Sequence, residues 1–455
     1  MPPTTRISGF PEWLPKDRLV ELEIIDTARS VFELHGFASI QTRSVEPLTE
    51  LLRKGEIDKE VYVLRRLQAS EDEAGPQAGS EGLGLHFDLT VPLARYVLQH
   101  AGHLDFPFRR YQIQQVWRGE RPQEGRFREF TQADIDIVDR AELAFHHEVE
   151  MAVVMSSLLA RLPIPAAVIH VSNRKLAEGF YRGVGAEDPA AVLRVIDKMD
   201  RVGPDETARM LVEQAGLSAA AADQCLGLAA ITATDGSFAD EVAGLGIGNA
   251  LMEQGVAELV AVVDGVNGLR PGSVVADLRI ARGLDYYTGT VYETFLAGYE
   301  SVGSIASGGR YDTLASDGDQ AYPGVGISLG VSRLVSILLD RGLVQVSRSV
   351  PSVVLVAVNE EASRADSDRI ANTLRSRGIA AEVAPRAEKF GKQIRHADRR
   401  GIPFVWFPGA AEPVKDIRGG VQLAADPAQW RPPDEDLRPQ VTRKDVGTAD
   451  SAETT

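Results

Sequence analysis

The stretch RRYQIQQVWRGERPQEGRFREFTQADIDIVD, from Arg109 to Asp139, decides the fold of this chain. Two runs with strand-like alternation flank a short loop that contains proline and glycine, a pattern typical of an antiparallel hairpin. Because side chains alternate faces along a strand, the returning strand places a set of polar and charged residues on one face. That set is Arg126, Arg128, Phe130, Gln132, Asp134 and Asp136.

The same face would be cationic near the loop, where Arg118 also ends the outgoing strand, and anionic farther along. A cationic end beside an anionic end suits a ligand that carries both phosphate and ammonium groups. The alternative is a solvated hairpin face, since short motifs often occur by chance.

A second segment, Pro323 to Gly342, predicts a short strand over Val325–Leu329 that runs through Gly330 into an apolar helix. Arg333 would lie in the first turn of that helix, where a cation opposes the helix dipole and is better explained by a nearby anion. The alternative is an ordinary strand–helix turn with a surface arginine.

The octapeptide RGLDYYTG, from Arg282 to Gly289, lies between two runs that predict buried strands. Arg282 can stabilise charge that develops on a phosphate, and the two adjacent tyrosines can line a slot for a flat polar ring. The alternative is a buried ion pair between Arg282 and Asp285 beneath two core tyrosines.

Composition sets the class of protein. The 455 residues suggest several domains, and 44% hydrophobic with 25% charged residues is typical of a soluble globular chain. No apolar run is long enough for a membrane helix, and the start of the chain predicts no secretory signal. Cys225 is the single cysteine, which favours a reducing cytoplasm. A net charge of −16 argues against a protein that coats nucleic acid, so any nucleic-acid site must be identified from a local basic patch.

Periodicity along the chain predicts a mixed α/β (α+β) fold with several domains. Helical spacing marks Leu19–Gly36 and Thr90–His100, and strand patterns alternate with helices after residue 350. The expected organisation is a domain in two parts, 1–173 and 271–340, interrupted by a helical insertion at 174–270. A linker at 341–350, an α/β unit at 351–430 and a disordered tail at 431–455 follow.

Several other site types lack support in the sequence. The eight histidines form no HxxxH or HExxH pair, so no metal site built from protein side chains is predicted. The sequence also has no GxSxG elbow, dinucleotide fingerprint or phosphate-binding loop.

The three segments resemble, in the right order, signatures of one family. RGLDYYTG resembles the histidine signature of histidyl-tRNA synthetases, the hairpin resembles their form of motif 2 of class II aminoacyl-tRNA synthetases, and GISLGVSRL resembles motif 3. GLHFDLTVPLARY is similar to the segment with the substrate-binding Asp-Leu-Thr. The unit after Pro351 is similar to the anticodon-binding domain of the family. The resemblance implies an antiparallel-sheet catalytic domain with a helical insertion and a C-terminal α/β anticodon-binding domain.

The resemblance also implies roles for individual residues. The family pattern assigns Arg282 and Arg118 to catalysis, and it assigns three overlapping sets to ligands. The histidine-binding set is Asp88, Leu89, Thr90, Arg118, Gln132, Asp136, Arg282, Tyr286 and Tyr287. The ATP-binding set is Arg118, Glu120, Arg126 and Arg333. Gln123, together with Lys389, Lys392, Arg395 and Arg399 from a basic helical stripe, is expected to contact tRNA.

The implied activity is that of a histidine–tRNA ligase. It would be an ATP-dependent enzyme of protein biosynthesis that uses Mg²⁺, acts on L-histidine and tRNA(His), and works in the cytoplasm as a homodimer. The alternative is a catalytically inactive paralogue that regulates or binds RNA. Two departures from the family pattern stand out: Arg43 replaces the usual proline of motif 1, and His86 replaces the usual arginine before the Asp-Leu-Thr segment.

Overall fold

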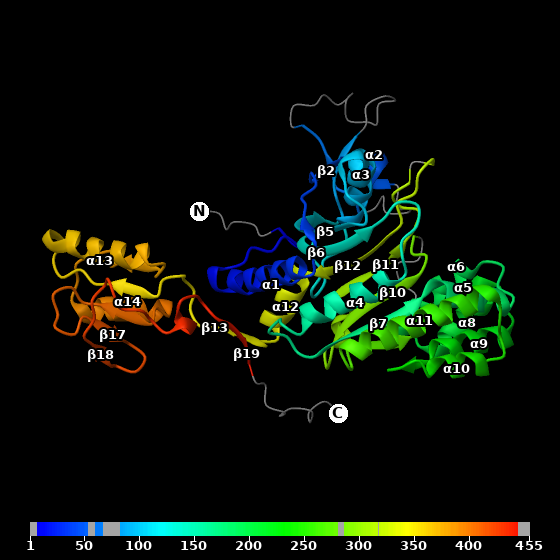
Figure 1. Cartoon of the computed structure of the whole chain (residues 1–455). Helices are drawn as coiled ribbons and strands as arrows, with labels where there is room; N and C mark the ends of the chain where they lie inside the picture. The colour runs from blue at the N-terminus through cyan, green and yellow to red at the C-terminus, as the bar shows by residue number, and fades with distance from the viewer. Residues whose placement is uncertain (1–6, 53–59, 67–81, 281–285, 317, 445–455) are drawn as a thin grey trace. The chain divides into compact units, whose positions relative to one another are not determined.

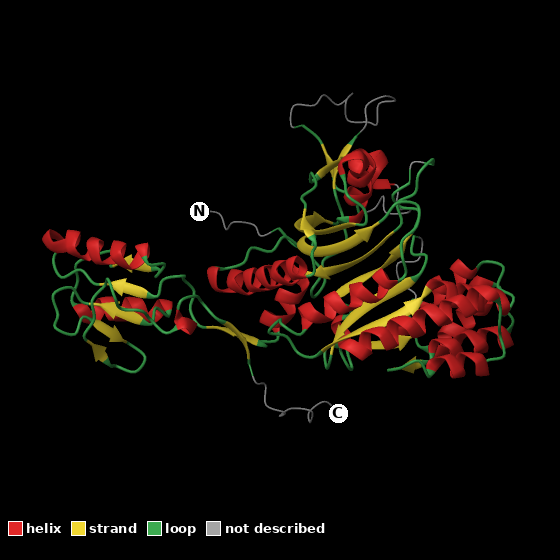
Figure 2. Cartoon of the chain, viewed as in Figure 1, coloured by secondary structure: helices red, strands yellow, loops and turns green. Residues whose placement is uncertain are grey.

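The computed structural model describes residues 7–52, 60–66, 82–280, 286–316 and 318–444. Contacts divide the chain into two compact units, residues 1–11 with 24–337 and residues 12–23 with 338–455. Figure 1 labels the helices and strands, and Figure 2 shows that both units combine the two kinds of element. No helix among the described residues is long and apolar enough to span a membrane.

A mixed sheet of nine strands forms the centre of the first unit in the described part of the chain. The order is β1-β5-β6-β12-β11-β10-β7-β9-β8, and neighbours from β5 through β7 are antiparallel. The strands are β1 (Ala38–Ser39), β5 (Phe108–Trp117), β6 (Glu129–Val138), β7 (Ala167–Asn173), β8 (Thr232–Ala233), β9 (Val274–Asp277), β10 (Thr290–Leu296), β11 (Ala306–Tyr311) and β12 (Gly324–Gly330).

The hairpin predicted from Arg109 to Asp139 is confirmed as β5 and β6. All ten residues of β5 pair with β6, from Phe108 opposite Val138 to Trp117 opposite Glu129. Such a register is fixed wherever one face of a strand is buried, because a slip of one residue would exchange the two faces. Ala133, Ile135 and Ile137 point to the buried face, so Gln132, Asp134 and Asp136 share the opposite one.

Helices cover the sheet and extend it. Helix α4 (His146–Leu159) packs on β6, β7 and β12, and α11 (Ala250–Leu269) packs on β7 and β9 (Figure 1). Helices α3 (Thr90–His100) and α4 lie within the first unit, whereas the residues of α1 (Pro15–Leu34) and α12 (Val331–Asp340) are divided between the two units. The predicted helices at 19–36 and 90–100 and the predicted strand–helix turn at Gly330 are therefore confirmed.

The segment predicted as a helical insertion is mostly helical. It contains α5 (Arg174–Gly183), α6 (Pro189–Ile196), α7 (Met199–Val202), α8 (Pro204–Ala215), α9 (Ala219–Ala229), α10 (Phe238–Gly244) and α11 (Ala250–Leu269). Asn173 caps α5 by accepting hydrogen bonds from the Lys175 and Leu176 amides. Gly255 lets α11 approach α5 closely, since a Cβ there would lie 2.2 Å from the Leu176 nitrogen.

A small three-stranded sheet lies beside α2 (Leu48–Leu51). Its order is β2-β4-β3, with β2 (Val45–Pro47), β3 (Val63–Leu64) and β4 (Leu83–Leu85). Leu51 is fully buried against Phe87 and Val91.

The second unit contains a five-stranded sheet, ordered β15-β14-β16-β17-β18 among the described residues. Its elements are β14 (Val354–Val356), α13 (Arg364–Ser376), β15 (Ala381–Val383), α14 (Phe390–Arg400), β16 (Phe404–Trp406), β17 (Val414–Asp416) and β18 (Gln422–Leu423). The strands and helices predicted after residue 350 are confirmed, and β14 pairs in parallel with both β15 and β16.

The prediction of a disordered tail from 431 is wrong for residues 431–444. Strand β19 (Val441–Arg443) pairs with β13 (Val344–Val346), which lies within the segment predicted to be a linker. Leu437 packs on the core of the unit, and the buried Arg348 guanidinium donates to the Asp436 carbonyl oxygen at 2.8 Å. The polar composition of the tail led to the wrong prediction. Main-chain hydrogen bonds pair the two strands, and such bonds do not depend on apolar side chains.

Candidate active site

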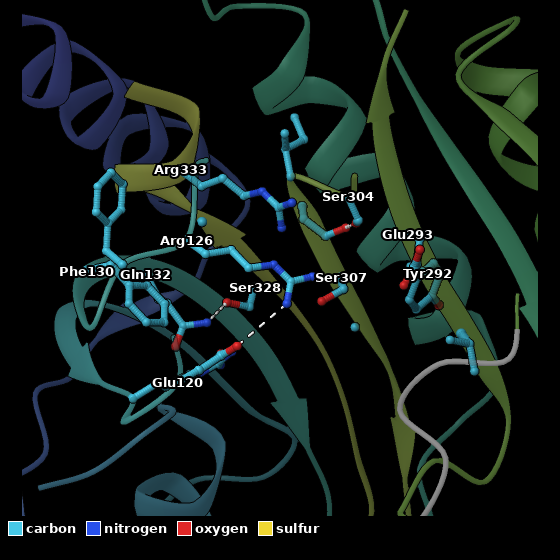
Figure 3. A pocket seen from close by; sticks show the side chains of 18 of the residues that line it. Glu120, Arg126, Phe130, Gln132, Tyr292, Glu293, Ser304, Ser307, Ser328 and Arg333 are labelled. Atoms are coloured by element: carbon cyan, nitrogen blue, oxygen red, sulfur yellow. Dashed lines mark hydrogen bonds and ion pairs between the residues drawn. The ribbon is translucent and has the colours of Figure 1, made fainter. Parts of the chain in front are cut away.

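Two adjoining cavities open on the face of β6 that the hairpin pattern singled out. The larger has a volume of about 310 Å³ and the smaller about 90 Å³. Residues of the hairpin, of β11 and β12, and of the segment before β10 line both cavities and form their common wall. Figure 3 shows the larger cavity from close by. The shared residues are Arg118, Gln132, Tyr286, Tyr287, Ser307, Gly308 and Ser328.

The larger cavity is cationic. Arg118, Arg126 and Arg333 line it, and the side chains of Arg126 and Arg333 extend into it in Figure 3. Glu120 lies 3.6 Å from Arg126 and 3.9 Å from Arg118. All four residues predicted to bind ATP therefore line one cavity in the structure. A pocket with three arginines suits a polyphosphate.

Arg118 lies where the two cavities meet. Its Nε donates to the Phe87 carbonyl oxygen at 3.0 Å, and its guanidinium lies 5.1 Å from the centre of the Phe130 ring. These contacts orient the Arg118 side chain, which remains partly exposed where it lines the cavities. Arg118 can therefore face a ligand in either cavity.

The smaller cavity collects carboxylates and hydroxyls. Asp88, Thr90, Gln132 and Asp136 line it beside both tyrosines of the octapeptide. The Asp88 Oδ1 also accepts a hydrogen bond from the Val91 amide, in the first turn of α3, at 3.1 Å. An anionic, ring-lined cavity beside a cationic one matches the division of charge that the hairpin predicted.

Asp136 is already paired within the protein. The fully buried Arg110 guanidinium lies 2.6 Å from its Oδ2, and the Tyr311 hydroxyl donates to its Oδ1 at 2.7 Å. Gly326, opposite Asp136 on β12, leaves room for this carboxylate, since a Cβ there would lie 2.1 Å from Oδ1. Asp136 therefore has a fixed orientation before any ligand binds.

Asp134 has a different environment, although it lines the same cavity. Burial raises the pKa of its carboxyl to about 7; Arg110 opposes that shift, and Asp136 adds to it. The Ser328 hydroxyl hydrogen-bonds to Asp134 and also accepts from the Gln132 amide at 2.7 Å. A buried carboxylate with little compensating charge favours a cationic neighbour.

Some predicted site residues lie elsewhere. Leu89 is buried and lines neither cavity, and its carbonyl oxygen accepts from Arg110 at 3.4 Å. Gln123 is exposed at the tip of the hairpin, and Arg128, expected on the polar face, instead donates to the Glu120 carbonyl oxygen. Arg282 lies outside the described residues.

Both departures from the family pattern have a structural account. Arg43 pairs with the buried Glu46 at 2.7 Å, and Glu46 also pairs with Arg95 at 2.6 Å. His86 is fully buried, where its Nε2 lies 2.7 Å from the Gln115 carbonyl oxygen and its ring stacks on Trp117. His86 lines neither cavity, so it does not replace a phosphate-binding arginine.

Sequence reasoning missed Arg110, Tyr311 and Ser328. Arg110 is on the same strand face as Gln112 and lies opposite Asp136 in the hairpin register, so an exact register would have identified it. Tyr311 and Ser328 come from strands distant in sequence, and only the sheet order brings them to β6.

A third cavity, of about 420 Å³, lies on α14 in the second unit. Lys392, Arg395 and Arg399 line it, as the basic stripe predicted, and Arg386 and His396 join them. Lys392 lies 3.4 Å from Glu388 in a pair that is about half exposed, which leaves the cavity accessible. Lys389 is exposed at the start of the helix but does not line the cavity.

Comparison with known proteins assigns both units. The family model described as "Histidyl-tRNA synthetase" matches residues 9–334, and the model described as "Anticodon binding domain" matches residues 352–416. A protein of Cutibacterium acnes named "Histidine--tRNA ligase" is 60% identical over 446 residues, which is 96% of this chain and 98% of that protein. A Micrococcus luteus protein of the same name is 57% identical, with coverage of 96% and 98%.

The solved structures agree with the sequence matches. The crystal structure of histidyl-tRNA synthetase from Nostoc sp. PCC 7120 has a TM-score of 0.82 to this fold and 33% sequence identity. The match covers 92% of this chain and 96% of that one. With a family model matched over most of its length and close relatives covered almost completely, this chain belongs to the histidyl-tRNA synthetase family.

Proposed function

We propose that the protein is a histidine–tRNA ligase. It would activate L-histidine with ATP to histidyl-adenylate and pyrophosphate, and then transfer histidine to the 3′ end of tRNA(His). The observation that carries the proposal is the pair of adjoining cavities, one cationic and one anionic, with Arg118 at their common wall. Membership of the family supports the same reaction.

In the first step, a carboxylate oxygen of histidine attacks the α-phosphorus of ATP. A new P–O bond forms, the bond from the α-phosphorus to the bridging oxygen breaks, and its electron pair leaves with pyrophosphate. In the second step, a ribose hydroxyl of the terminal adenosine attacks the histidyl carbonyl carbon, and AMP leaves. Little covalent chemistry is asked of the protein, so positioning and charge neutralisation carry the rate.

The residues around the cavities divide this work. Arg118, Arg126 and Arg333 would neutralise the phosphates, with Glu120 orienting the two hairpin arginines. Gln132 and Asp136, with Asp88 and Thr90, would bind histidine in the smaller cavity. Tyr286 and Tyr287 would bound the imidazole, whose one donor and one acceptor such a pocket can pair. The transition-state role of Arg282 stays a prediction.

A magnesium ion would enter with ATP. Glu120 and Glu293 line the larger cavity, and carboxylate oxygens are the donors that Mg²⁺ prefers. When bound, the ion would neutralise phosphate charge.

Pyrophosphate exchange tests the proposed reaction. We expect labelled pyrophosphate to enter ATP in the presence of histidine and not of the other nineteen amino acids. Charging of tRNA(His) should follow on the same preparation. Absence of histidine-dependent exchange from a folded protein would instead favour the inactive paralogue.

We further propose that the protein is a cytoplasmic homodimer. Leu52, Val63, Leu64 and Leu83, around the small sheet, each expose 40% or more of their surface. These residues follow the motif 1 segment, and a second copy of this chain would cover them. The single, buried cysteine fits a reducing compartment.

The basic face of α14 is the proposed tRNA contact of the second unit. We expect the triple variant Lys392→Gln/Arg395→Gln/Arg399→Gln to raise the KM for tRNA and to flatten its salt dependence, because fewer counterions are released on binding. Aminoacylation over a salt series measures both effects, and pyrophosphate exchange on the same preparation should stay unchanged.

A matched control removes three cations from elsewhere on the same unit. Arg369, Arg375 and Arg377 lie on or directly after α13, outside the α14 cavity. Equal effects of the two triple variants would show that general charge, rather than this face, attracts tRNA.

A further inference from the structure

Asp134 carries an unpaired atom into the smaller cavity. The residue is 3% exposed, and its Oδ1 has no hydrogen-bond partner among the described residues. Buried polar atoms in folded proteins are nearly always paired. An open carboxylate oxygen that lines a ligand cavity therefore indicates that the ligand supplies the missing donor.

The neighbouring carboxylate does not need that donor. Asp136 already has Arg110 at 2.6 Å and the Tyr311 hydroxyl at 2.7 Å. Asp134 has the Ser328 hydroxyl and no full cationic partner at hydrogen-bonding distance among the described ion pairs. Of the two, Asp134 is better suited to receive a positive charge brought by a ligand.

The position of Asp134 along β6 indicates which charge that is. Side chains two residues apart on a strand are about 7 Å apart, and the face runs from Gln132 through Asp134 to Asp136. Gln132 lies at the common wall with the cationic cavity, whereas Asp136 lines only the smaller one. A histidine whose carboxylate reaches the common wall and whose imidazole lies at the far end presents its α-ammonium to the middle of the face.

We propose that Asp134 is a further histidine-binding residue, whose ionised carboxylate accepts a hydrogen bond from the α-ammonium of the substrate. This assignment rests on the proposed function. It adds to the predicted histidine-binding set a residue that selects for the positive charge of the amino acid. It also gives the fixed carboxylate, Asp136, a separate task at the imidazole end.

Binding of the cation should then be coupled to loss of a proton. The charged or titratable groups that face Asp134 are Asp136, Arg110, Asp88, Arg118, Tyr286, Tyr287 and Tyr311. Burial raises the pKa of the Asp134 carboxyl to about 7, against the attraction of Arg110. Below pH 7 the free protein is therefore mostly protonated at Asp134 and must release this proton to bind an ammonium ion, whereas above pH 7 it need not.

Two ligands that differ only in the amine test the contact between Asp134 and the α-ammonium. Histidinol carries the imidazole and the ammonium, and 3-(imidazol-4-yl)propan-1-ol is the same molecule without the amine. Calorimetry at pH 8 should show that Asp134→Asn weakens histidinol binding roughly 10- to 100-fold, the range for a charge-assisted hydrogen bond, and changes binding of the amine-free analogue little. Asp139→Asn, the same chemical change just beyond the end of β6, should alter neither affinity.

Titration of pH supplies a second readout. The ligand's own ionisation affects wild type and Asp134→Asn alike, so the ratio of their dissociation constants reports on Asp134. We expect the wild-type advantage for histidinol to shrink about tenfold from pH 8 to pH 6, as Asp134 takes up its proton. If Asp134→Asn does not fold, Asp134→Ala replaces it in both experiments. We expect this variant to lose the same preference for histidinol over the amine-free analogue.

Equal losses for both ligands, or an advantage that does not change with pH, would overturn the role of Asp134. Such results beside normal histidine-dependent pyrophosphate exchange would leave the proposed function intact. A folded wild-type protein that neither binds histidinol nor catalyses the exchange would instead refute the proposed function and this role with it.

Discussion

Replacement of Arg118 by alanine should lower the rate of histidyl-adenylate formation by about 10²- to 10³-fold, the loss typical of one donor aimed at developing charge. Arg118 lies at the wall shared by the two cavities and is the residue best placed to face both the histidine carboxylate and the α-phosphate. Its effect should be larger on the rate than on either binding constant, because the negative charge at that point grows in the transition state.

Single-turnover formation of the adenylate measures this rate without product release. Arg118→Lys should recover part of the rate, because it keeps the charge and loses the paired donors of the guanidinium. Arg121→Ala is the matched control: it removes an exposed arginine of the same hairpin that lines neither cavity. A near-normal single-turnover rate in Arg118→Ala would refute the assignment.

Arg110→Met should destabilise the first unit by about 3–5 kcal/mol, the range for removal of one partner of a buried ion pair. Arg110 is fully buried and its partner Asp136 nearly so, which leaves Asp136 as an uncompensated carboxylate in the variant. Thermal unfolding measures this loss as a lower midpoint of the transition of the first unit. That transition is identified as the one whose midpoint rises when histidine and ATP are added, since ligands stabilise the unit that binds them.

The adjacent residue supplies the control. Arg109 pairs with Glu150 at 2.6 Å from the same strand, but both side chains are partly exposed. Arg109→Met should therefore cost about 1 kcal/mol or less. Equal destabilisation by the two variants would show that the burial of the Arg110–Asp136 pair is not what makes it important. Replacement of both partners, as in Arg110→Met/Asp136→Leu, should restore much of the lost stability.

The sequence predicted the secondary structure around the site well, because local patterns determine it. Strand alternation identified β6 and its polar face, and helical spacing identified the basic face of α14. These are properties of a segment and its immediate neighbours, so no tertiary knowledge was needed.

The pairing inside the site could not be predicted in the same way. Whether Asp136 faces a ligand or a protein cation depends on the register of β5, and Tyr311 reaches it from a strand 175 residues later in the chain. Family patterns do not supply this either, since they name Asp136 and not the residues that hold it. The Arg43 and His86 substitutions were likewise uninterpretable until Glu46 and Trp117 were located.

The ribbon formed by β13 and β19 has a consequence for the order of events during folding. The two paired strands lie nearly one hundred residues apart in the chain, and the five-stranded sheet of the second unit lies between them in sequence. Pairing of residues so far apart requires a long loop to close first, which slows its formation. We therefore expect the ribbon to form later than pairings between strands close in sequence, such as β16 with β17.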